Sequence, residues 1–129
     1  MHSAAVTAEG DRIRWVELPG QDPARVYVHG LGATAPAYFT ATAVHPLLAG
    51  HRSLLVDLLG HGHSDRPTSF AYTLEDHADT LAAALRTAGV TAAEFVAHSM
   101  GGSGVRITGL VVTPPNETKS VTLDWPGRR

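Results

Sequence analysis

Residues 97–102 of the 129-residue chain read Ala97-His98-Ser99-Met100-Gly101-Gly102, and no other segment is as informative about the fold. Ser99 has a small residue two positions away on each side, Ala97 and Gly101. This pattern is typical of a sharp turn from a strand into a helix, where close approach of neighbouring backbones excludes large side chains. The strain of such a turn exposes the serine hydroxyl as a nucleophile and directs the next backbone N–H, that of Met100, at an oxyanion. A pentapeptide match is weak alone, so the prediction depends on its context.

The residues before this turn predict strands that alternate with helices. The clearest helix spans residues 73–88, where Thr73 suits the N-cap and apolar residues recur on one face. Gly89 suits the position just after its C-terminus. The other expected elements are a hairpin of residues 6–8 and 13–18, a loop at 18–23, strands at 24–30, 53–57 and 94–98, and a helix at 37–48. This order predicts an α/β fold, with a mostly parallel sheet, flanking helices and an N-terminal β-hairpin.

The pattern changes after residue 102, which we take as a domain boundary. Residues 107–112 favour one more strand, but residues 103–106 are too short for a parallel crossover, which needs about a dozen residues. Residues 113–129 are polar and contain three prolines. We therefore divide the chain into residues 1–102, with regular α/β organisation, and residues 103–129, an atypical tail with one possible strand and little order.

A second motif, His29-Gly30-Leu31-Gly32, ends an earlier strand. An acyl-transfer site needs a second N–H from a separate loop to complete its oxyanion hole, and Leu31 is the simplest donor. His29 itself is more plausible as a support for this loop than as a catalytic base.

A third motif occupies residues 57–67, Asp57-Leu58-Leu59-Gly60-His61-Gly62-His63-Ser64-Asp65-Arg66-Pro67. Two glycines one residue apart allow a tight, irregular loop. His61 and His63 suggest a metal, but two loop histidines without a third ligand rarely form a site, so we expect no metal. Asp65 and Arg66 are expected to fix the loop through local hydrogen bonds.

Together the three motifs resemble the N-terminal half of an α/β-hydrolase-fold protein, over residues 1–102. Residues 29–32 resemble the family's oxyanion loop, residues 57–67 its loop after strand four, and residues 97–102 the nucleophile elbow of its esterase-like members. The resemblance implies a serine hydrolase of small ester or related acyl substrates that needs no cofactor. Ser99 would be the nucleophile, and the N–H groups of Leu31 and Met100 would hold the oxyanion.

The chain also departs from the family pattern. In this fold the acid and then the histidine of the triad follow the serine. All eight histidines lie at positions 2 to 98, however, and Glu117 and Asp124 are the only later carboxylates. The helix expected after the elbow is missing, because glycines occupy its place. We therefore expect an incomplete α/β-hydrolase fold, from a truncated or frame-shifted chain or a fragment, that is weakly active or inactive.

An alternative is a non-catalytic remnant or interaction module. Half of such a sheet leaves an unfinished edge, through which the chain could associate with itself or with another protein.

The composition and charge argue against several classes of partner and chemistry. The formal net charge is −2 and no basic run occurs, so we expect no nucleic-acid partner. The absence of cysteine excludes disulfides and a thiolate nucleophile. No apolar run approaches the roughly 18 residues of a membrane span, and the N-terminus has no signal-peptide pattern. We expect a cytoplasmic protein without a membrane partner.

Overall fold

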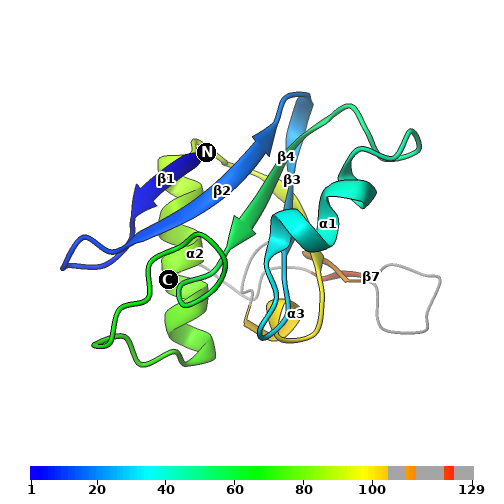
Figure 1. Cartoon of the computed structure of the whole chain (residues 1–129). Coiled ribbons are helices and arrows are strands. Elements are labelled where there is room, and N and C mark those ends of the chain that lie inside the picture. The colour runs from blue at the N-terminus through cyan, green and yellow to red at the C-terminus, as the bar shows by residue number, and fades with distance from the viewer. Residues whose placement is uncertain (105–109, 113–120, 124–129) are drawn as a thin grey trace.

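The computed structural model describes residues 1–104, 110–112 and 121–123, which form one seven-stranded mixed sheet with three helices (Figure 1). The strand order is β1-β2-β4-β3-β5-β6-β7. The strands are β1 (His2–Ala5), β2 (Arg12–Leu18), β3 (Gln21–Val28), β4 (His51–Asp57), β5 (Ala93–Ala97), β6 (Leu110–Val112) and β7 (Val121–Leu123). The helices are α1 (Ala35–Ala43), α2 (Leu74–Thr87) and α3 (Met100–Gly104).

The centre of the sheet is parallel and its two sides are antiparallel. β4, β3, β5 and β6 pair in parallel. β1, β2 and β4 pair antiparallel on one side, and β6 and β7 do so on the other. The predicted mostly parallel α/β sheet with an N-terminal hairpin is therefore confirmed.

Helices cover both faces of the central strands, which explains their nearly continuous apolar sequences. Val26 and Val28 of β3 point to the face that α2 covers, where they share a core with Leu81. Tyr27 points to the opposite face and packs with Phe39 of α1. Because successive strand residues alternate between faces, β3 contributes to both cores.

The α2 helix begins and ends where its sequence predicts. The Thr73 hydroxyl accepts a hydrogen bond from the Asp76 N–H at 3.1 Å, as an N-cap should. Gly89 follows the C-terminus with φ of 75°. With 14 residues, α2 is still far short of a bilayer's thickness, and no helix in the described ranges has the length and apolarity to cross a membrane.

Three predicted elements before Ser99 have boundaries that were wrong by three residues or more, and the other ends there differ by at most two. The first hairpin strand is β1 rather than residues 6–8, because Thr7 and Asp11 hydrogen-bond to each other and make that segment the turn. The α1 helix ends at Ala43 instead of Leu48, since Pro46 lacks the N–H that would continue it. β3 begins at Gln21, within the predicted loop, because it already pairs there with β4.

The chain after the elbow is more regular than its sequence suggests. A short helix, α3, starts at Met100, so the expectation that no helix follows the elbow was wrong. β6 lies within the predicted strand 107–112 and pairs with β5, whereas β7 lies in the tail for which little order was expected. The rest of residues 105–129 lies outside the described residues, and the division at residue 102 stays a prediction.

Candidate active site

Ser99 occupies a strained turn between the end of β5 and the start of α3. Its φ is 54°, in the left-handed region that residues other than glycine seldom adopt. Two backbone hydrogen bonds of 3.0 Å close the turn, from the Gly101 N–H to the His98 carbonyl and from the Gly102 N–H to the Ser99 carbonyl. The serine is exposed to solvent. This is the strand–turn–helix geometry that residues 97–102 predict.

Close packing against β3 explains why residue 101 is glycine. A Cβ on Gly101 would lie 2.6 Å from the carbonyl oxygens of both Val28 and His29. Backbone oxygens cannot move aside by a side-chain rotation. Any larger residue would therefore push the elbow away from the end of β3.

The predicted oxyanion loop, residues 29–32, lies directly beside Ser99. A Cβ on Gly30 would lie only 3.3 Å from the Cβ of Ser99. Within the part of the chain that the structure describes, the N–H groups of Leu31 and Met100 donate no hydrogen bond, whereas those of Ala33 and Gly101 do. The structure thus places the loop that carries Leu31 next to Ser99.

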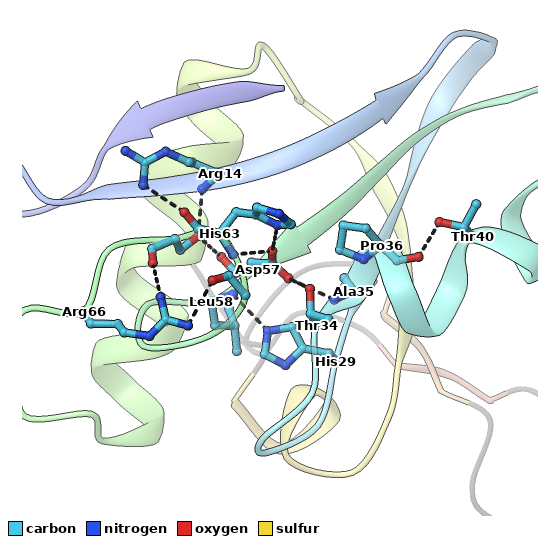
Figure 2. Close-up of polar contacts among 12 residues, drawn as sticks. Arg14, His29, Thr34, Ala35, Pro36, Thr40, Asp57, Leu58, His63 and Arg66 are labelled. Atoms are coloured by element: carbon cyan, nitrogen blue, oxygen red, sulfur yellow. Dashed lines mark hydrogen bonds and ion pairs between the residues drawn. The ribbon is translucent and has the colours of Figure 1, made fainter.

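His29 supports this loop and is unsuited to act as a base. It is fully buried, its Nδ1 lies 2.7 Å from the Gly30 carbonyl oxygen, and its Nε2 lies 3.0 Å from the Leu58 backbone nitrogen (Figure 2). The Leu58 N–H can only donate, so Nε2 accepts and Nδ1 carries the proton. Burial lowers the pKa of His29, which favours this neutral form. The prediction that His29 supports the loop is confirmed.

Asp57 joins the oxyanion loop to the loop after β4, a role that sequence reasoning missed. Its buried carboxylate accepts hydrogen bonds from the Thr34 hydroxyl at 2.7 Å, the Ala35 N–H at 2.9 Å and the His63 N–H at 2.9 Å (Figure 2). The negative charge thereby lies at the N-terminus of α1, where the helix dipole stabilises it. A Cβ on Gly62 would overlap the same carboxylate, so this close contact requires glycine. The only sequence signal was an acidic residue that ends an apolar strand before a glycine-rich loop.

The two loop histidines engage neighbouring groups separately. The Nδ1 of His63 lies 3.4 Å from the Asp57 carboxylate, and the Nδ1 of His61 lies 3.1 Å from the Leu59 carbonyl oxygen. The described residues contain no group of three or more side chains suited to hold a metal ion. The absence of a metal here therefore stays a prediction.

Asp65 and Arg66 fix the loop after β4, as predicted, although Asp65 does so through β2. The Asp65 carboxylate accepts hydrogen bonds from the Arg12 N–H at 2.8 Å and from Arg14 Nη1 at 2.6 Å. The Arg14 hydrogen bond lowers the pKa of the Asp65 carboxyl most, and the Arg12 N–H adds to it. The Arg66 guanidinium donates to the carbonyls of Ser64 and Gly62 within the loop (Figure 2).

A base for Ser99 is not found in the described part of the chain. No histidine nitrogen there hydrogen-bonds to the Ser99 hydroxyl, and the His98 ring stacks on Tyr38 instead. Glu117 and Asp124 lie outside the described residues. The geometry thus places an exposed serine beside the loop of residues 29–32.

A mixed sheet in this strand order, with parallel central strands and a serine elbow after β5, defines the class of α/β-hydrolase folds. A family model described as alpha/beta hydrolase fold matches residues 24–126, and the chain belongs to this family.

Curated relatives and solved structures agree with this assignment. The chain is 32% identical over 113 residues to a probable lysophospholipase, BODYGUARD 4, of Arabidopsis thaliana. It is also 32% identical over 118 residues to the dihydrolipoyllysine-residue acetyltransferase component of an acetoin cleaving system of Cupriavidus necator. These matches cover 85% and 92% of the chain but only 27% and 30% of the relatives, so the chain spans less than a third of their length.

Among solved structures, an esterase from Exiguobacterium antarcticum superposes with a TM-score of 0.74 at 22% identity, which shows a shared fold. That match covers 88% of this chain and 45% of the esterase. An enol-lactonase from Burkholderia xenovorans LB400 superposes with a TM-score of 0.68 at 29% identity, over 80% of this chain and 39% of the lactonase.

Proposed function

We propose that this chain carries the nucleophile and the oxyanion hole of a serine hydrolase that acts on small esters or related acyl substrates. The observation that carries the proposal is the left-handed φ of 54° at Ser99, on an elbow held against β3. Names among the similar proteins include a lysophospholipase, an esterase and an enol-lactonase, which favours acyl substrates.

The proposed chemistry is acyl transfer through a covalent intermediate. The Ser99 oxygen attacks the carbonyl carbon, and the carbonyl oxygen becomes an oxyanion between the N–H groups of Leu31 and Met100. Collapse of this intermediate expels the alcohol and leaves an acyl-enzyme, which water then hydrolyses. The serine proton needs an acceptor, which we propose is a histidine from outside this chain, oriented by an acid, and the same histidine then gives the proton to the leaving alcohol oxygen.

This missing acceptor sets the expected rate. In a comparable triad, loss of the base lowers kcat by about 10⁶-fold, while the oxyanion hole and binding retain roughly 10³ to 10⁴-fold over water. The chain alone should therefore acylate slowly and turn over poorly.

A fluorophosphonate probe tests the nucleophile directly. Intact-mass analysis after prolonged incubation should show one slow addition, which peptide mapping places on Ser99. The matched controls are Ser99→Ala, which should abolish the addition, and Ser69→Ala in an exposed loop, which should leave it unchanged. Equal labelling of native protein and Ser99→Ala would refute the proposed nucleophile.

A second candidate is association through a sheet edge. β1 and β7 each pair with only one neighbour in the described sheet, and such edges carry backbone groups able to pair with another strand. Sedimentation equilibrium separates the candidates, because an interaction module should form a dimer or larger species at micromolar concentration. A well-folded monomer would argue against it.

A further inference from the structure

The ring of His98, the residue before Ser99, is restrained on both its backbone and its ring face. The His98 N–H donates to the Val28 carbonyl at 3.1 Å, and the His98 carbonyl accepts from the Gly101 N–H at 3.0 Å. Its ring stacks on Tyr38 with a centroid distance of 5.1 Å and an interplanar angle of 27°. The backbone and the stacking together restrain this exposed ring beside Ser99.

Tyr38 contacts a buried aromatic residue on one side and is exposed to solvent on the other. It follows the first turn of α1 and contacts the edge of Phe39 at a centroid distance of 4.8 Å. Phe39 is buried and packs on Tyr27 in the core. Tyr38 nevertheless leaves 52% of its surface exposed, so α1 presents to solvent an aromatic ring that already packs on two neighbouring rings.

This aromatic pair is continuous with the oxyanion loop. The Nδ1 atom of His98 lies only 2.9 Å from the place where a Cβ on Gly30 would be, so the ring covers that glycine. Leu31, the next residue, has 78% of its surface exposed. The segments that carry these two rings and this aliphatic side chain therefore meet next to the turn at Ser99.

We infer that Tyr38, His98 and Leu31 form a specificity subsite that binds a planar aromatic group of the substrate, which makes aryl esters the preferred substrate class. This inference rests on the proposed function, because it assigns the substrate of the same serine. An aromatic ring gains an offset-stacked or edge-to-face contact with a preorganised aromatic pair, in addition to the area that it buries. An alkyl chain of equal size gains only the buried area. The rings need no reordering on binding, so little entropy opposes the contact.

The subsite is tested by ligand binding, without turnover. The affinity of Ser99→Ala protein for methyl 4-fluorobenzoate and for methyl 6-fluorohexanoate is measured by fluorine NMR titration. We expect about fivefold tighter binding of the aryl ester, a factor that matches typical aromatic pair energies. Adding Tyr38→Leu, which keeps an apolar side chain but removes the ring, should abolish this preference.

Two further variants serve as controls. Tyr38→Phe keeps the ring and should keep the preference. Leu47→Ala removes another exposed apolar side chain, beyond the end of α1, and should change nothing. Equal affinities for the two esters, or a preference that survives Tyr38→Leu, would overturn the subsite.

Failure of the subsite and failure of the proposed function give different results. If the aryl preference depends on Tyr38 but the fluorophosphonate does not label Ser99, the subsite stands as a binding site and the nucleophile is refuted. If Ser99 is labelled without any aryl preference, only the subsite is refuted.

Discussion

Alanine at position 101 should destabilise the protein, whereas alanine at the neighbouring position 102 should not. A Cβ on Gly101 would lie 2.6 Å from two backbone oxygens, and ordinary contact begins at 3.4 Å, so about 0.8 Å of backbone movement is required. Such overpacking costs about 1 to 3 kcal/mol. A Cβ on Gly102 meets only the Ala97 Cβ, at 3.8 Å, and alanine gains up to about 1 kcal/mol over glycine in a helix.

The two variants should therefore differ by about 2 kcal/mol in their free energy of unfolding. With a urea m-value of about 2 kcal/mol per molar for a small domain, their denaturation midpoints should differ by about 1 M. Urea titration followed by circular dichroism measures both midpoints, with m-values checked for equality. Equal midpoints, or a less stable Gly102→Ala variant, would show that the elbow does not press on β3.

Three further predictions concern acid sensitivity, a helix cap and an ion pair. Burial lowers the pKa of both His29 and His77 from 6.5, so the unfolded chain binds more protons and stability should fall as the pH drops below about 6.5. A urea midpoint that holds or rises between pH 7.5 and 5.5 would contradict this. Thr73→Ala should lower the free energy of unfolding by about 1 kcal/mol, because it removes the side-chain cap of α2, and Thr73→Ser should restore most of it. Arg52→Met should lower it by a similar amount of about 1 kcal/mol, because Arg52 donates to the partly exposed Glu17 carboxylate at 2.9 Å and to the Ala88 carbonyl at 2.7 Å. Thermal melts check both effects, and unchanged melting temperatures would refute them.

Local sequence patterns predicted α2 and the turn at Ser99, because the interactions that form these elements lie within a few residues of one another. The α2 helix carries its own cap at Thr73, and the elbow's small residues reflect one tight turn. The glycine-rich segment after Ser99 has low helix propensity, so its sequence wrongly predicts that no helix follows the elbow. In this segment tertiary contact outweighs helix propensity, since only a glycine at position 101 fits against β3.

The support of the candidate site was harder to predict, because its partners are distant in sequence. Asp57 binds Thr34 and Ala35 across more than 20 residues, and no periodicity reports such contacts. His29 could be predicted as a support from its place at a strand end. Its partner Leu58, 29 residues away, could not.

The contacts of Asp57 also bear on how the site moves. One buried carboxylate holds the amide of Ala35, which begins α1 directly after the predicted oxyanion loop, and the amide of His63 in the loop after β4. Opening either loop alone would leave this charge with fewer donors, which is costly in a buried position. The two amides should therefore exchange their hydrogens with solvent in one cooperative event and with the same protection factor. The oxyanion loop and the loop after β4 would then open and close as a single unit.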